Sequence, residues 1–149
     1  MKILMVCLGN ICRSPLAEGI LRHKVNNDVQ VASAGTGNWH VGEAPDKRSI
    51  LVAKQHGVDI SQQRAQHFTP AMFDDFDLIF AMDGQNYSDL KKMAQNEEHL
   101  SKLHLFLEDA LGEANDVPDP YYGGESDFVH VFQLIDDATD RLVEKYKLS

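Results

Sequence analysis

Both cysteines of the chain lie in one short segment near its beginning, VCLGNICRSP, residues 6–15. Five residues separate Cys7 from Arg13, and Ser14 follows directly. A loop that leads into a helix directs backbone N–H groups and the positive end of the helix dipole at one point, where an anion binds well. The planar guanidinium of Arg13 can bind two phosphate oxygens. The lysine of a nucleotide-binding P-loop is absent. The segment therefore predicts a phosphate cradle around a thiol.

Cys7 is the candidate nucleophile of this cradle, because N–H donors and a guanidinium favour the thiolate over the thiol. Gly9 lets the backbone approach a ligand, and Asn10 tolerates positive φ. Ser14 is expected to cap the helix and also to donate a hydrogen bond to the Cys7 sulfur when that sulfur leaves. The alternative is that Cys7 is a small buried residue at the end of a strand.

A candidate acid lies far downstream, in the motif VPDPYYGG. Asp119 is flanked by two prolines, which fix φ and favour an extended conformation, so its carboxyl group is held on a stiff loop. Such a group can supply the proton that a leaving oxygen needs. Tyr121 and Tyr122 follow and can form an aromatic wall for a flat substrate group. Taken alone, the motif would more simply be a turn.

The chain as a whole limits the possible classes of protein. Its 149 residues, 43% of them hydrophobic, predict one domain over residues 1–149. A net charge of −9, without a Lys/Arg tract, excludes a nucleic-acid surface. The early apolar run at residues 3–6 is too short for a signal peptide or membrane span, so we expect a cytoplasmic protein without membrane insertion. No cysteine or histidine spacing indicates a metal site, and no cofactor is expected.

Short apolar runs alternate with helical patterns along the chain. Strands are expected at residues 2–6, 29–33, 77–82 and 103–107, and helices at residues 46–56, 85–93 and 127–147. A further helix is expected to have Ser14 as its N-cap and Pro15 as its first residue. This alternation predicts a parallel sheet with helices on both faces. Ligands of such sheets bind beyond the carboxyl ends of the strands, where the Cys7 loop lies.

Several motifs together resemble the low-molecular-weight protein tyrosine phosphatases. VCLGNICRSPLAE and DPYYGG carry the resemblance, and SAGT, HGVDIS, FDLIFAMD and SDF occur in the expected order, so it covers essentially the whole chain. The resemblance implies a flavodoxin-like, three-layer α/β fold with a four-stranded parallel sheet in the order 2-1-3-4. It also implies metal-independent, two-step hydrolysis of phosphotyrosine in proteins and of small aryl phosphates. Tyrosine-phosphorylated proteins, tyrosine kinases among them, are the implied partners.

The resemblance also implies a role for each residue of the site. Cys7 would form a phosphocysteine, and Asp119 would protonate the leaving phenolate and later activate water. Ser14 would stabilise the departing thiolate, and the guanidinium of Arg13 would bind phosphate together with the loop amides. The phosphate-binding loop comprises Cys7, Leu8, Gly9, Asn10, Ile11, Cys12 and Arg13.

Positions outside the loop are expected to support it. Asn10 would organise the loop through hydrogen bonds, with Ser33 as a partner. Trp39 matches a variable position on the pocket rim and can join Tyr121 and Tyr122 around the substrate ring. The alternative for Trp39 is ordinary packing.

The segment SQQRAQHF departs from the usual pattern of the family. Gln63, Gln66 and His67 stand where histidine, arginine and glutamine are common. Gln63 can still donate a hydrogen bond that supports the loop, but it carries no charge.

Cys12 is the second thiol of the loop. The resemblance implies a reversible disulfide between Cys7 and Cys12 that protects the nucleophile under oxidation. The alternative is an inert buried thiol, because two cysteines pair only where their geometry permits.

Other functions on the same fold remain to be weighed. An arsenate reductase needs further cysteines downstream, and none follows Cys12. Protein-arginine phosphatases tend to have threonine at the position of Ile11 and lack the tyrosine pair. A non-enzymatic module that binds phosphate or flavin would not explain the combination of Cys7, Arg13 and Asp119.

Overall fold

Four parallel strands form the centre of the protein, for which a computed structural model describes residues 1–149. The strands are β1 (Lys2–Cys7), β2 (Gln30–Gly35), β3 (Leu78–Ala81) and β4 (Leu103–Leu105). Their order in the sheet is β2-β1-β3-β4, and every neighbouring pair is parallel. The predicted α/β class and the strand order 2-1-3-4 are therefore confirmed.

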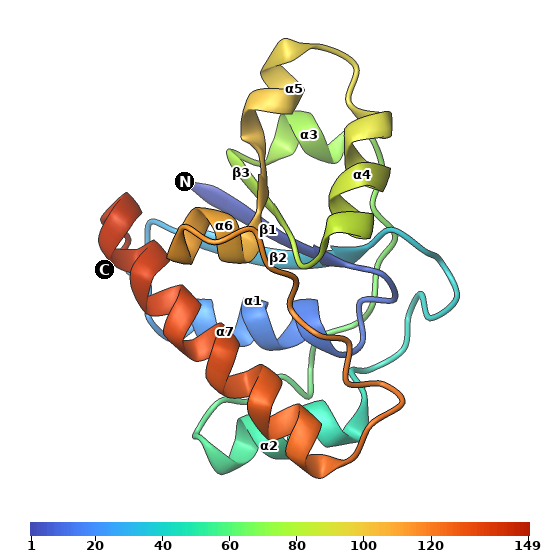
Figure 1. Cartoon of the computed structure of the whole chain (residues 1–149), viewed down its shortest axis with the longest axis vertical. Coiled ribbons are helices and arrows are strands. Elements are labelled where there is room, and N and C mark those ends of the chain that lie inside the picture. Colours follow the sequence, from blue (N-terminus) through green and yellow to red (C-terminus); the bar gives the residue numbers. More distant parts are fainter.

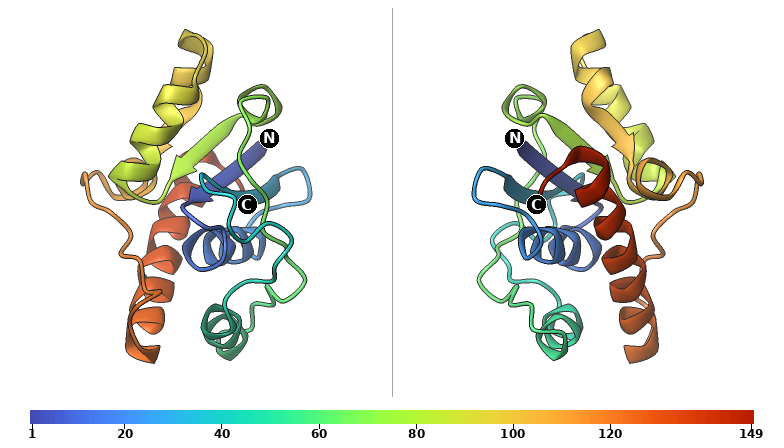
Figure 2. Two further views of the ribbon diagram at one scale, coloured as in Figure 1. Left: turned by 90° about the vertical axis from the view of Figure 1, so that its right-hand side faces the viewer. Right: turned by 90° about the vertical axis from the view of Figure 1, so that its left-hand side faces the viewer.

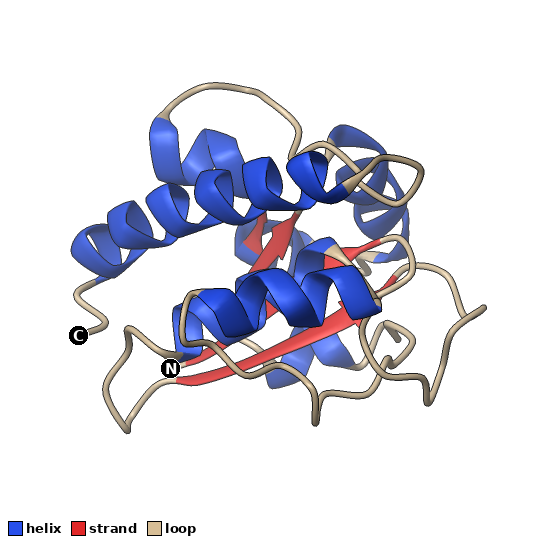
Figure 3. Cartoon of the chain, turned by 90° about the horizontal axis from the view of Figure 1, so that it is seen from below, coloured by secondary structure: helices blue, strands red, loops and turns tan.

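Helices cover both faces of the sheet, as the views in Figures 1 and 2 show. In Figure 3 the strands lie in the middle, with helices around them. One face carries α1 (Arg13–Arg22), α2 (Lys47–Gln55), α6 (Phe106–Leu111) and α7 (Glu125–Tyr146). The other face carries α3 (Met72–Asp75), α4 (Gly84–Met93) and α5 (Glu97–Lys102). No helix is both long enough and apolar enough to cross a membrane.

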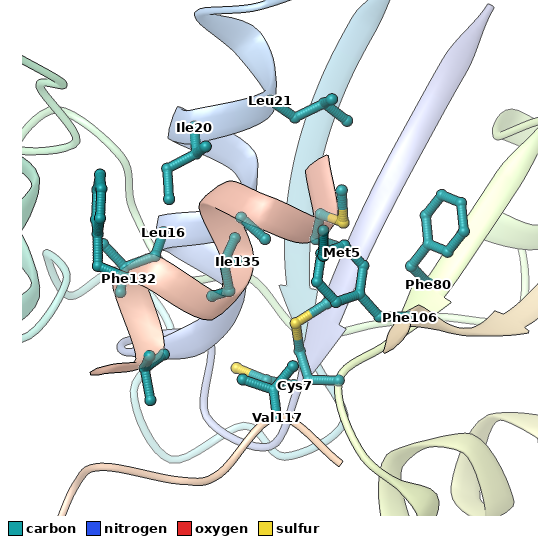
Figure 4. Packing of buried hydrophobic residues seen from close by; sticks show 14 of the residues in the cluster. Met5, Cys7, Leu16, Ile20, Leu21, Phe80, Phe106, Val117, Phe132 and Ile135 are labelled. Atoms are coloured by element: carbon teal, nitrogen blue, oxygen red, sulfur yellow. The ribbon is translucent and has the colours of Figure 1, made fainter. Parts of the chain in front are cut away.

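The two hydrophobic clusters follow from the alternation of side chains along β1. Ile3, Met5 and Cys7 point into the larger cluster, under α1 and α7, whereas Leu4 and Val6 belong to the smaller cluster on the opposite face. All five side chains are almost completely buried, as expected for a central parallel strand. Figure 4 shows the larger cluster, where Cys7 lies at the end of β1 beyond Met5. The thiol thus lies at the carboxyl end of the central strand, next to the core.

The first helix begins two residues earlier than predicted. The N-cap position of α1 is Cys12, which makes no side-chain cap, and the helix starts at Arg13. The prediction that Ser14 caps the helix is wrong, because its hydroxyl group bonds to Asn10 and lies against Cys7 instead. The first N–H groups of α1 are therefore left without a side-chain partner.

Other boundaries shift for local reasons. The fourth strand ends at Leu105, and the predicted strand residues 106 and 107 begin α6, whose first turn carries Glu108 and Asp109. A short edge strand gives little backbone for unwanted pairing. The second strand extends beyond Ser33 to Gly35, and the last helix spans 125–146 rather than 127–147. The short helices α3 and α5 were not predicted, because four and six residues show too little periodicity.

The loops at the carboxyl ends of the strands lie together (Figure 1). The loop after β1, the loop after β2 and the orange segment that precedes α7 occupy the same side of the molecule. This is the edge at which open parallel sheets bind their ligands.

Candidate active site

Five consecutive backbone N–H groups, those of residues 8–12, donate no hydrogen bond within the protein. They follow β1 and precede α1, so they form a turn between Cys7 and the helix start. A series of successive N–H groups without a partner in the protein is typical of an anion site. The helix dipole adds partial positive charge at the same point. We call residues 7–13 the cradle.

Asn10 holds the conformation of the cradle. Its backbone has φ 57°, in the left-handed region that asparagine tolerates better than most residues. Its side-chain oxygen accepts a hydrogen bond from the Gln66 N–H at 3.0 Å. Its side-chain nitrogen donates to Ser14 Oγ at 2.8 Å and to Ser33 Oγ at 2.9 Å. Because the backbone donor fixes the orientation of the amide, both hydroxyl groups act as acceptors towards Asn10.

Ser14 connects this network to the thiol. Cys7 Sγ lies 2.9 Å from Ser14 Oγ, and both residues are buried. Since Ser14 Oγ already accepts from Asn10, its own proton is free to point at the sulfur. A hydrogen bond that donates to sulfur stabilises the charged thiolate more than the thiol.

Ser33 connects the network to Glu18 on the other side. Ser33 Oγ donates to Glu18 Oε1 at 2.7 Å, and Arg22 bonds to the second oxygen at 3.2 Å. Burial raises the pKa of Glu18, while Ser33 and Arg22 partly oppose that shift. The cradle therefore rests on a buried carboxyl group that the sequence did not indicate.

Arg13 is 3% exposed and lies at the bottom of the site. Its Nη1 donates to Asp83 Oδ2 at 2.6 Å and to Val117 O at 3.0 Å. Burial acts to lower the pKa of Arg13, but the charges of Cys7 and Asp83 outweigh it and the pKa rises. The guanidinium thus stays charged. Asp83 and Val117 fix its orientation from the side opposite to the ligand.

Asp119 lies beside this guanidinium. Its Oδ2 is 3.7 Å from Arg13 Nη2, and its side chain is 45% exposed. Its Oδ1 accepts from the N–H of Tyr121 at 3.1 Å. The structure therefore brings together residues separated by more than a hundred positions, and it leaves the carboxyl group accessible to a ligand.

A pocket of about 220 Å³ lies between the cradle and Asp119. Its rim is lined by Trp39, Tyr121 and Tyr122, which are 68%, 38% and 96% exposed. His40 also lines the pocket, although the sequence did not predict it. The rings of the two tyrosines meet edge to face, with centroids 5.0 Å apart. A wall of this kind suits a flat ring attached to a phosphate. No cluster of three or more metal-ligating side chains is present.

The three departures from the family pattern lie behind the cradle. Gln63 Nε2 donates to Pro15 O at 3.1 Å, so Gln63 supports α1 rather than the cradle itself. Gln66 contacts the network more directly, through its N–H to Asn10 and its side-chain nitrogen to Ser33 O at 2.9 Å. His67 Nε2 lies 3.1 Å from Thr36 O and is exposed. The sequence did not predict that Gln66 would contact both Asn10 and Ser33.

Cys12 is buried and free, as is Cys7. Burial, followed by the charge of Asp46, raises the pKa of Cys12 to about 12. Cys12 is therefore a neutral thiol near pH 7 and a poor nucleophile. Cys7 Sγ lies against the Ser14 hydroxyl group, whereas the Cys12 thiol makes no hydrogen bond, so the two cysteines of the cradle have different surroundings.

Sequence reasoning also missed Asp83 and Gly35. Asp83 is the N-cap of α4 and faces Arg13 from another strand end. A Cβ atom at Gly35 would lie 2.8 Å from Leu8 O, so only glycine lets β2 pass the cradle this closely. A glycine at the end of a strand, as at Gly35, is the sequence feature that could have indicated this close approach.

Comparison with known proteins agrees with this geometry. The family model described as low molecular weight phosphotyrosine protein phosphatase matches residues 2–148. The low molecular weight protein-tyrosine-phosphatase YfkJ of Bacillus subtilis is 38% identical over 149 residues, 95% of this chain and 93% of that protein. The protein tyrosine phosphatase of Entamoeba histolytica superimposes with a TM-score of 0.91 at 35% identity, covering 99% of this chain and 97% of the other. Vibrio vulnificus Wzb, solved with benzylphosphonate, gives a TM-score of 0.88 at 37% identity over 97% of both chains. The chain therefore belongs to the low molecular weight phosphotyrosine protein phosphatase family.

Proposed function

We propose that the chain forms one phosphatase domain, residues 1–149, that hydrolyses phosphotyrosine in proteins through a phosphocysteine on Cys7. The observation that carries this proposal is the cradle of five free N–H groups around a thiol, with Arg13 below it and Asp119 at its mouth. These groups supply a nucleophile, charge stabilisation for a phosphoryl group and a proton donor.

In the first step, Cys7 Sγ attacks phosphorus, an S–P bond forms, and the P–O bond to the phenol breaks. Asp119 gives its proton to the leaving oxygen, which matters because a phenol has a pKa of about 10. Arg13 and the N–H groups of residues 8–12 bind the equatorial oxygens, where charge spreads in the transition state.

In the second step, water attacks phosphorus and the S–P bond breaks. Asp119, now a carboxylate, takes a proton from that water. The hydroxyl group of Ser14 donates to the thiolate that departs, 2.9 Å away. Inorganic phosphate is released, and the thiolate and the acid are ready for another cycle.

The natural substrates are proposed to be tyrosine-phosphorylated proteins, tyrosine kinases among them. The rim of Trp39, Tyr121 and Tyr122 supports an aromatic substrate, because aromatic side chains pack well against a flat ring. A cytoplasmic location fits the same chemistry, since a reducing compartment keeps the Cys7 thiol free.

Activity on aryl phosphates in the presence of a chelator tests the proposal. We expect Cys7→Ser to lower kcat at least about 10⁴-fold, because serine is not ionised in this cradle. Asp119→Ala should cost about 10²- to 10⁴-fold on phenyl phosphate. Matching melting temperatures would show that both variants are folded. Full activity in Cys7→Ser would rule out the covalent mechanism.

We further propose that Cys12 forms a disulfide with Cys7 when Cys7 is oxidised. The position of Cys12 in the same loop supports this role, since Cys12 is the other thiol of the chain. After peroxide treatment, a reductant should restore most of the wild-type activity and far less of the Cys12→Ser activity. Equal recovery in the two proteins would show that Cys12 has no protective role.

A further inference from the structure

The segment that carries Asp119 is attached to the protein at few points. We call residues 118–124 the acid loop. Two of its residues are prolines, which cannot donate backbone hydrogen bonds. Its own hydrogen bonds run from the Gly123 N–H to Pro120 O and from the Tyr121 N–H to Asp119 Oδ1. Neither tyrosine hydroxyl group has a partner, so the loop contributes little to its own position.

Arg48, near the start of α2, donates the hydrogen bonds that join the acid loop to a distant part of the chain. Its Nη1 donates to Gly123 O at 3.0 Å, and its Nη2 donates to Tyr121 O at 2.9 Å. No other hydrogen bond links residues 118–124 to a segment outside the loop and the adjoining α7. Figure 1 shows the start of α2 beside the orange segment that leads into α7.

The guanidinium of Arg48 is itself held rigidly. Asp46, the N-cap of α2, accepts from the Arg48 N–H at 2.8 Å, from Nε at 3.0 Å and from Nη2 at 2.9 Å. The hydrogen bonds from Arg48 hold the pKa of Asp46 below its usual range, so this carboxylate stays ionised near neutral pH. The ring of Phe128 lies 4.4 Å from the guanidinium carbon. A planar fork fixed by a carboxylate and a ring is preorganised to hold two carbonyl groups.

The contact with Tyr121 continues to the candidate acid. Arg48 binds the carbonyl oxygen of Tyr121, and the N–H of the same residue donates to Asp119. Only Pro120, whose φ is restricted, therefore lies between Asp119 and the anchored residue Tyr121. The position of the Tyr121 peptide group therefore bears directly on that of the Asp119 carboxyl group, which also lies 3.7 Å from Arg13 Nη2.

We propose that Arg48 is a positioning residue for the reaction, which anchors the acid loop to α2 and thereby holds the Asp119 carboxyl group at the leaving oxygen. The proposal rests on the function proposed above for Asp119. The Arg48–Asp46 ion pair, whose side chains are 35% and 13% exposed, lies within the start of α2 and does not itself position the acid loop. The two bonds to loop carbonyl groups instead determine where a proton donor lies, and a misplacement of about 1 Å can cost about 10²-fold in rate.

Substrates with different leaving groups test this role. The acid matters for phenyl phosphate, whose phenol leaves poorly, and little for 2,4-dinitrophenyl phosphate, whose anion leaves without a proton. We expect Arg48→Met to lower kcat/KM for phenyl phosphate about 10- to 100-fold and to leave the dinitrophenyl ester nearly unchanged. The comparison uses kcat/KM because this ratio reports phosphorylation of the enzyme rather than the later attack of water.

A double variant separates positioning from a general structural effect. If Arg48 acts through Asp119, Arg48→Met combined with Asp119→Ala should be no slower on phenyl phosphate than Asp119→Ala alone. The matched control is Arg141→Met, an exposed arginine of α7 without a hydrogen bond or ion pair, which should match the wild type. Asp46→Asn keeps an oxygen for the helix cap but loses the ion pair, and should give a weaker form of the same pattern.

The proposal would be overturned if Arg48→Met lowered kcat/KM equally for the two esters, or did not lower it at all. It would also be overturned if the double variant were slower than Asp119→Ala by the same factor by which Arg48→Met slows the wild type. If Arg48→Met does not fold, Asp46→Asn decides by the same comparison. If Asp119→Ala slows both esters equally, the role proposed for Asp119 is at fault, and the anchoring proposal falls with it.

Discussion

The cradle is buried and hydrogen-bonded from several elements, whereas the acid loop on the opposite side of the pocket is exposed and anchored at few points. Asn10 and Arg13 are each 3% exposed, but the Asp119 side chain is 45% exposed and Tyr122 is 96% exposed. The cradle receives support from β2, from residue 66 and from Asp83. The acid loop receives two hydrogen bonds from Arg48, and it also contacts the protein through the Arg13–Asp119 ion pair and the buried Pro120.

This difference agrees with the roles proposed for the two sides of the pocket. The cradle presents free N–H groups and a charged arginine to a phosphate, and such groups are useful only if they are already oriented before the ligand arrives. The acid loop must admit a bulky protein substrate and release a phenol, so it cannot be enclosed by neighbouring elements. In the proposed mechanism, rigid binding of charge and accessible proton transfer thus belong to different segments.

The largest effect should come from changing the buried charge of the cradle. Arg13→Lys keeps a positive charge but removes the fork that contacts Asp83, Val117 and the ligand. We expect kcat/KM for aryl phosphates to fall about 10²- to 10³-fold. Competition by inorganic phosphate measures the same loss without chemistry. Undiminished phosphate inhibition would show that lysine suffices and that fork geometry is unimportant.

A smaller effect on activity, with a clear effect on stability, is expected from Asn10→Ala. Alanine is strained at φ 57°, and the Gln66 N–H loses its acceptor, so unfolding should become easier by about 2–4 kcal/mol. Urea denaturation measures this change. Asn10→Gly is the control, because it relieves the strain and keeps only the loss of hydrogen bonds. If both variants were as stable as the wild type, the cradle would not depend on this network.

The smallest effect should come from the exposed side. Tyr122→Ala removes a ring that covers little of the protein, so the melting temperature and kcat should not change. For a phosphotyrosine peptide, we expect KM to rise about 2- to 10-fold, since aromatic contacts contribute about 0.5–1.5 kcal/mol. A change in melting temperature comparable to that of Asn10→Ala would contradict the distinction between the two sides.

Local sequence signals predicted the cradle better than its surroundings. Cys7, Arg13 and Ser14 belong to one short segment, and the alternation of strands and helices placed that segment at the ligand-binding edge of the sheet. Asp83 and Glu18 gave no such signal, and Gln66 stood out only as a departure from the usual pattern of the family. Each is an ordinary polar residue in its own segment, and it gains importance because the fold brings it to within hydrogen-bond distance of the cradle or of its partners.

The prediction for Ser14 shows the same limit at a single residue. A serine before a proline is typical of a helix N-cap, and local preference alone favoured that interpretation. In the folded protein its hydroxyl group lies between Asn10 and Cys7. The tertiary contacts replaced the local one because a buried hydroxyl group must satisfy the polar atoms around it.

The sequence by itself determined the class of fold, the strand order through its resemblance to the family, and the residues with reactive chemistry. These properties depend on periodicity and on short motifs, which a linear chain displays directly. Only the tertiary structure decided which residues hold the reactive ones in place. Arg48 and Asp119 are separated by 71 positions, and nothing in either segment indicates that one guanidinium binds the other's loop. Such contacts exist because the loops that follow parallel strands lie at one edge of the sheet, and this proximity arises only when the chain folds.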